Sequence, residues 1–147
     1  MVYSSDHTGK FPASTNGFGD ALLELVKYDP SVLHSICGPD DDGHLFQDAL
    51  TNGAIVPEQK CSRVYVQGLT GTNNPGICIL FDRNSCKGGD HFRSPWGHPL
   101  REVTFVDGSW HQVRDEDWPE FSRKQVDLLI ADGFSKADAL HYYPAAK

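Results

Sequence analysis

Residues 101–106 (REVTFV) and 110–114 (WHQVR), joined by DGS at 107–109, decide the fold class more than any other part of the chain. Two strand-like runs around an Asp-Gly turn signal predict an antiparallel β-hairpin. A two-residue turn at Asp107-Gly108 agrees with the residue preferences of tight hairpin turns. A three-residue loop at 107–109 better separates the apolar from the polar side chains onto opposite faces of the hairpin. The three-residue loop would put three apolar side chains on one face: Val103, Phe105 and Val113. Both registers remain open at this level.

Three further strands are expected upstream of the hairpin. Residues 77–82 form an apolar run of strand length, which predicts the central strand of the sheet. Residues 63–68 and 31–37 alternate in polarity and are also predicted as strands. The segment from 83 to 99 is rich in Gly and Pro, and we expect it to be irregular.

Helices are predicted where capping residues and prolines meet a helical apolar pattern. Asp20 is the expected N-cap of a helix that Pro30 ends, and Pro119 suits the first position of another that stops at Gly133. The expected helices are 20–28, 44–50, 119–131 and 135–140, the last capped by Ser135. The sequence therefore predicts an α+β fold, with short helices packed on a small antiparallel sheet. We expect one domain over 1–147, including a C-terminal β-hairpin and a helical tail at 116–140.

Composition and charge restrict the class of partner. The chain has 147 residues, and its formal net charge is −7. Lys and Arg form no run, and a nucleic-acid-binding protein normally carries a basic stripe against the phosphates. The composition therefore argues against DNA and RNA as partners.

Four cysteines are candidates for disulfide bonds: Cys37, Cys61, Cys78 and Cys86. None of their spacings is Cys-x-x-Cys, which argues against a zinc ribbon or a thioredoxin-type site. Two disulfides would stabilise a domain with a small core, and buried free thiols are the alternative. All three pairings remain open.

Four motifs, taken in order, resemble those of type II secretion pseudopilins and related prepilin-type proteins. YSSDHTGKFP at 3–12 is similar to the segment that ends the long N-terminal helix of many pseudopilins. CGPD at 37–40 resembles a Cys-Pro-x-Asp loop of their heads, and LFDR at 80–83 resembles a Leu-x-x-Asp strand end. His98, eight residues before Asp107-Gly108, resembles a C-terminal His-x9-Asp-Gly signature with one residue fewer.

The resemblance implies a structural subunit with no reaction of its own. Such a protein carries an apolar N-terminal helix that prepilin peptidase processes and that anchors it in the inner membrane. Its α+β head faces the periplasm, and its partners are other pseudopilin subunits and secretion-system components. The resemblance also implies that a membrane helix would precede this sequence, and an oxidising compartment would suit the cysteines.

Calcium is the one cofactor for which the sequence offers candidate ligands. Pseudopilins bind calcium in a head loop, and hard cations favour carboxylate and carbonyl oxygens. The candidates here are two groups of aspartates: Asp40 and Asp42, and Asp82, Asp90 and Asp107. Neither group has the alternating Asp-x-Asp-x-Asp-Gly frame, so solvated loop carboxylates are the favoured interpretation.

The residue pattern gives little support for a catalytic site. The histidines at 91, 98 and 111 lack the helical spacing of zinc ligands, and no Gly-x-Ser-x-Gly elbow is present. We therefore expect no catalytic residues and no enzyme activity. The competing hypotheses are a small secreted module that binds a glycan or calcium, and, after it, a metal-dependent enzyme.

Overall fold

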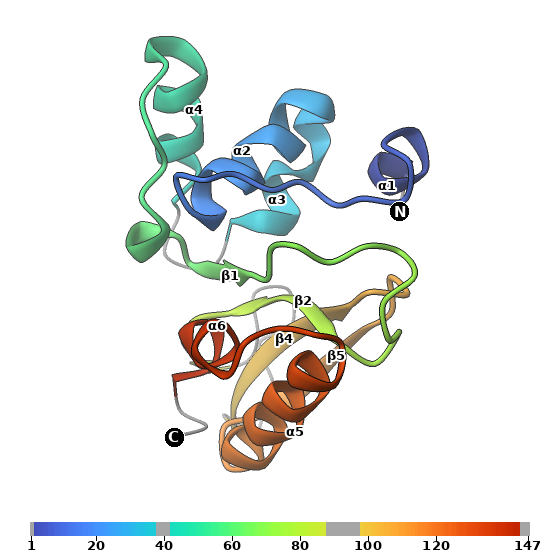
Figure 1. Ribbon diagram of the computed structural model, residues 1–147. Helices are drawn as coiled ribbons and strands as arrows, with labels where there is room; N and C mark the ends of the chain where they lie inside the picture. Colours follow the sequence, from blue (N-terminus) through green and yellow to red (C-terminus); the bar gives the residue numbers. More distant parts are fainter. Residues whose placement is uncertain (1, 38–41, 88–97, 145–147) are drawn as a thin grey trace.

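Five strands form one antiparallel sheet at the centre of the computed structural model, with helices on both faces (Figure 1). The structure describes residues 2–37, 42–87 and 98–144. Helices α2, α3 and α4 lie on one side of the sheet, and α5 and α6 lie on the other. The predicted α+β class is confirmed. The strands are β1 (Arg63–Tyr65), β2 (Cys78–Asp82), β3 (Cys86–Lys87), β4 (Pro99–Phe105) and β5 (Trp110–Arg114).

Strand β2 is an interior strand, as its apolar run predicts. It pairs with β1 on one side and with β4 on the other, and β5 pairs with the far edge of β4. Strand β3 lies within the segment expected to be irregular, and it extends the sheet by pairing with the start of β4. Residues 88–97 of that segment lie outside the described part of the chain.

The β4–β5 hairpin has a three-residue loop at 106–108, one position earlier than the three-residue alternative. The Phe105 amide donates to the Ser109 carbonyl at 2.8 Å, and the Gly108 amide donates to the Phe105 carbonyl at 2.9 Å. Gly108 has a φ of 85°, which closes the turn in the left-handed region that glycine favours. Val103, Phe105 and Val113 all pack against the core, as the three-residue loop requires.

Four α-helices and two short 3-10 helices precede the sheet in the described part of the chain. The prediction of a strand at 31–37 is wrong, because this segment is helical. Asp29 accepts a hydrogen bond from the Ser31 amide at 2.9 Å, and Pro30 supplies the first helical φ, so the chain starts a new helical turn. The N-terminal elements are α1 (Val2–Asp6), α2 (Phe18–Tyr28), η1 (Pro30–Val32), α3 (Leu33–Ile36), α4 (Gly43–Asn52) and η2 (Glu58–Lys60).

Helix α2 begins two residues before the predicted N-cap and packs closely on its neighbours. Asp20 lies in the first turn, and its carboxylate accepts a hydrogen bond from the Val56 amide at 2.9 Å. At Gly19 an added Cβ would lie only 2.1 Å from the Val56 carbonyl oxygen. The predicted helix 44–50 is confirmed within α4, which ends at Gly53 in the left-handed conformation.

The helical tail covers the second face of the sheet. It consists of α5 (Trp118–Ala131) and α6 (Lys136–Tyr142), and Ser135 caps α6 as predicted. Gln125 of α5 is buried, accepts a hydrogen bond from the Cys78 amide at 2.8 Å and donates to the Gly76 carbonyl at 3.1 Å. Phe81, Trp118 and Tyr143 stack between this layer and the sheet, with centroid distances of 4.7 Å (Phe81–Tyr143) and 5.3 Å (Phe81–Trp118).

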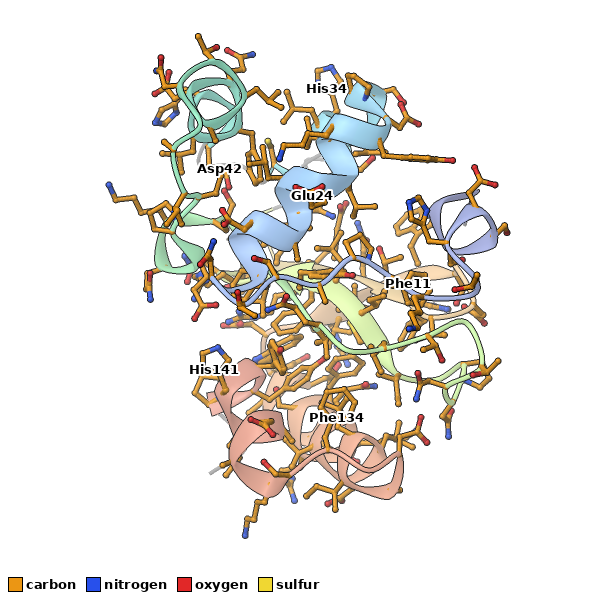
Figure 2. The ribbon with its side chains drawn as sticks, turned by 45° about the horizontal axis from the view of Figure 1, so that its top comes forward. Phe11, Glu24, His34, Asp42, Phe134 and His141 are labelled. Atoms are coloured by element: carbon orange, nitrogen blue, oxygen red, sulfur yellow. The ribbon has the colours of Figure 1, made fainter. Side chains whose placement is uncertain are left out.

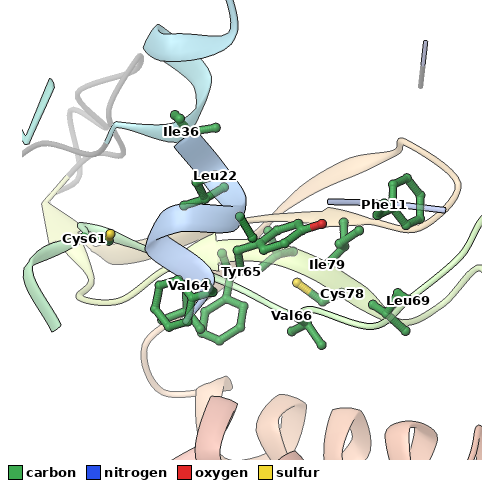
Figure 3. Close-up of a cluster of buried hydrophobic side chains, with 14 of the residues drawn as sticks. Phe11, Leu22, Ile36, Cys61, Val64, Tyr65, Val66, Leu69, Cys78 and Ile79 are labelled. Atoms are coloured by element: carbon green, nitrogen blue, oxygen red, sulfur yellow. The ribbon is translucent and has the colours of Figure 1, made fainter. Parts of the chain in front are cut away.

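Buried apolar side chains from both helical layers and the sheet form one continuous cluster. Figure 3 shows Leu22 of α2 above the sheet and Val64, Tyr65 and Val66 along the first strand and its exit. Burial of apolar area in this cluster is the main stabilising contribution, at roughly 25 cal/mol per Å². Among the described helices, none is both long and apolar enough to span a lipid bilayer.

Candidate functional site

A groove of about 560 Å³ lies between the α2–α3 layer and the sheet. Its helical wall is apolar and its floor is the sheet face under α2. This volume falls in the range of small-molecule pockets, which is roughly 300–1,000 Å³. The wall side chains are Phe11, Pro12, Leu22, Leu25, Tyr28, Asp29, Val32, Ser35 and Ile36, and the floor is Arg63, Tyr65, Ile79, Leu80, Glu102, Thr104, Gly108 and Trp110.

Strand register explains how residues far apart in sequence form this floor. Tyr65 pairs with Leu80, Leu80 with Thr104, and Thr104 with Trp110, so these four residues form one cross-strand row. Side chains in such a row point to the same face of the sheet. The row is aromatic at both ends, which gives the groove an apolar floor with one exposed tryptophan, since Trp110 is 61% exposed.

A second, charged row runs beside the first. Arg63 contacts Asp82 through Nε and Oδ1 at 3.2 Å, and it contacts Glu102 through Nη2 and Oε2 at 2.9 Å. The side chains of Arg63, Asp82 and Glu102 are only 6%, 1% and 12% exposed. The second oxygen of Asp82 accepts a hydrogen bond from the Glu102 amide at 2.7 Å. One cation between two carboxylates gives this buried row a formal net charge of −1.

Asp29 adds another carboxylate to the helical wall. Its Oδ1 accepts hydrogen bonds from the amide and the hydroxyl of Ser31, at 2.9 Å and 2.6 Å. The hydrogen bond from the Ser31 hydroxyl, and to a smaller extent the one from the Ser31 amide, lowers the pKa of Asp29 below its ordinary value. Asp29 therefore stays ionised at neutral pH, next to the partly exposed ring of Tyr28.

The segment 3–12 carries the chain from α1 onto the sheet. Thr8 and Gly9 both have positive φ, 55° and 82°, and this pair ends the helical conformation after α1. The chain then pairs with the loop after β1: the Phe11 amide donates to the Leu69 carbonyl at 3.4 Å, and the Gly71 amide donates to the Gly9 carbonyl at 2.7 Å. These backbone hydrogen bonds fix the segment to the loop after β1.

Helix α1 also contacts the end of α2. The Tyr28 hydroxyl donates to the Asp6 carboxylate, and the rings of His7 and Tyr28 meet edge to face with centroids 5.5 Å apart. Phe11, which follows, is buried and lines the groove. Figure 2 labels it on the segment that follows α1. The motif at 3–12 therefore forms the short helix α1 and a segment after it, which pack against the end of α2 and the loop after β1.

The three described calcium candidates each hold a structural hydrogen bond on a different element. Asp42 accepts from the Ser62 amide at 2.7 Å, Asp82 belongs to the charged row, and Asp107 accepts from the Ser109 amide at 2.8 Å. Within the described part of the chain, no three His, Cys, Asp or Glu side chains form a group that could hold a metal ion. Asp40 and Asp90 lie outside the described residues, and calcium binding stays a prediction.

Of the histidines considered as metal ligands, the two that the structure describes do not line the groove. His98 and His111 are exposed, and His111 contacts the ring of Phe105 with centroids 5.5 Å apart. His91 lies outside the described residues. The structure therefore gives no role in the groove to the two histidines that it describes.

Cys61 and Cys78 are buried thiols in this structure. Burial raises the pKa of each to about 12, so both remain protonated at neutral pH. Cys37 is half-buried, and the side chain of Cys86 in β3 is not among those described. The disulfide bonds stay a prediction.

Sequence reasoning missed the charged row. One signal was present: Arg63 and Glu102 are charged residues inside predicted strands, and charged side chains are buried in proteins mainly when they are paired. Their partner Asp82 was identified as a calcium candidate and as part of the LFDR motif, and its ion pair with Arg63 was not predicted.

No family model, curated protein or solved structure matches this chain. The resemblance to pseudopilins is therefore carried by the four sequence motifs alone.

Proposed function

We propose that this chain is the head of a pseudopilin-like subunit of a type II secretion or type IV pilus-like assembly. In this proposal it supports protein export as a structural component and catalyses no reaction. The observation that carries the proposal is the junction at residues 3–12. There a motif similar to the end of the pseudopilin helix is helical up to Asp6 and is then hydrogen-bonded to the loop that follows β1.

The junction suits a mechanical role. A subunit that transmits movement from a filament helix to its head needs a connection that does not swivel. Here the helix end contacts Tyr28, and the following residues pair with Leu69 and Thr70 at the sheet side. Several hydrogen bonds in parallel oppose rotation better than a flexible glycine-rich linker would.

The proposal includes a location and a set of partners. The head would face the periplasm, attached to the inner membrane through an apolar helix that precedes this sequence in the full protein. Its partners would be other pseudopilin subunits and secretion-system components. The acidic net charge of −7 is unfavourable for a nucleic-acid partner.

The decisive experiment is the N-terminal sequence and intact mass of the native protein, isolated from the membranes of its own cells. The proposal predicts a processed, methylated first residue followed by about 20 apolar residues that lead to Tyr3. A native protein that starts at Met1 and is recovered in the soluble fraction would contradict it. Intermolecular cross-links between heads in intact cells would show assembly independently.

The groove favours a second candidate function, a module that binds a small ligand. This possibility does not depend on the pseudopilin proposal, since a head domain and a free secreted domain can both carry a pocket.

A further inference from the structure

The groove beneath α2 has an apolar wall that can hold a hydrocarbon or aromatic body. Leu25 of α2 and Val32 of η1 line the groove on the helical side and Leu80 lines its floor, and all three are only partly buried, so they present apolar surface to a ligand. A pocket lined mainly by apolar side chains, with a few polar groups, buries most of the surface of a bound small molecule. Burial of that surface supplies the affinity, and the charged groups decide which head group is accepted.

The charged side chains that line the groove are Asp29, Arg63 and Glu102. Arg63 is already held between Glu102 and the buried Asp82, so its charge is balanced before any ligand enters. These four groups together have a formal net charge of −2. An anionic head group would therefore meet repulsion, whereas a cation would be attracted.

Strand register puts an exposed aromatic ring next to the Glu102 carboxylate. Thr104 pairs with Trp110 and Glu102 with Gln112, so Glu102 and Trp110 are diagonal neighbours on the same face of the β4–β5 pair. Diagonal neighbours are about 7–8 Å apart, within reach of aromatic and long side chains. A carboxylate beside an indole ring is a favourable environment for an ammonium ion, through charge attraction and cation–π contact.

We propose that this groove binds a positively charged amphipathic small molecule, an ammonium group attached to an apolar chain. The ammonium group lies between Glu102 and Trp110, and the apolar chain lies along Leu25, Val32 and Leu80. The partly exposed ring of Tyr28 and the ionised carboxylate of Asp29 face the ligand from the helical wall.

Binding of matched probes tests the proposal directly. Octyltrimethylammonium, octanoate and octyl glucoside have the same apolar chain and differ in head-group charge, and each is titrated into the protein by calorimetry below its micellar concentration. The expected result is saturable binding of the ammonium probe, at least about tenfold tighter than octanoate, which equals about 1.4 kcal/mol. Octyl glucoside should bind with intermediate affinity. Equal or tighter binding of octanoate, or no saturable binding of the ammonium probe, would overturn the proposal.

Two variants locate the site. Glu102→Gln removes one charge from the groove and should reduce the preference for ammonium over octanoate by about tenfold. The matched control Glu116→Gln removes an exposed carboxylate outside the groove and should leave the preference unchanged. Thr104→Phe keeps every charge but fills the floor, so it should weaken all three probes together. It serves as the locating variant if Glu102→Gln does not fold, and unchanged binding in Thr104→Phe would refute the assignment to this groove.

Discussion

The buried charged row makes a quantitative prediction for the substitution Arg63→Met. The Arg63 side chain is 6% exposed and lies 3.2 Å from Asp82 and 2.9 Å from Glu102. Methionine fills much of the same volume but leaves two carboxylates together, with 1% and 12% exposure. Breaking a buried ion pair by removing one partner costs about 3–5 kcal/mol, because the remaining charges stay buried without compensation.

The expected loss is large against the whole stability of such a domain, which is typically 5–15 kcal/mol. Urea unfolding, followed by the fluorescence of the buried Trp118, measures it at pH 7. With a loss of about 4 kcal/mol and an m-value of about 2 kcal/mol/M, the midpoint should fall by about 2 M urea.

Arg114→Met is the matched control for this experiment. Arg114 also pairs with two carboxylates, those of Glu116 and Asp117, but its side chain is 57% exposed. Exposed ion pairs contribute about 0–1 kcal/mol, so the control should change stability little. A loss below about 1 kcal/mol for Arg63→Met, or a loss no greater than that of Arg114→Met, would refute the argument that burial makes the loss of this cation costly.

Three further predictions concern close packing, a buried amide and the thiols. Gly19→Ala should destabilise the protein by about 1–3 kcal/mol because the added Cβ would clash with the backbone of Val56. Gly71→Ala should be nearly neutral because its Cβ makes only an ordinary van der Waals contact. Urea unfolding of both variants measures the difference. Gln125→Leu should cost about 1–3 kcal/mol in the same assay, since the Cys78 amide loses its acceptor. In reduced protein, Cys61 and Cys78 should resist iodoacetamide at pH 8, and stability should fall as pH rises above about 8.5, where unfolded thiols ionise and folded ones remain protonated. Rapid alkylation of either thiol in the native state would contradict their burial.

Local signals in the sequence predicted most of the elements. The hairpin turn, the Pro119 helix start and the Ser135 cap depend on contacts within a few residues, so they can be read from adjacent positions. The strand prediction for residues 31–37 was wrong because the alternating pattern is short and fits a helical turn as well as a strand. The helical conformation is favoured there because Asp29 accepts a capping hydrogen bond from the Ser31 amide and Pro30 has its φ fixed near the helical value.

The sequence by itself determined the α+β class, the β4–β5 hairpin, most of the helices and the acidic net charge. The groove and its charged row form only through long-range contacts in the tertiary structure. Arg63 and Glu102 are 39 positions apart, and their contact depends on the register of β1, β2 and β4. Register is set by how the whole sheet packs between two helical layers, and a shift by one residue would turn these charges to the opposite face.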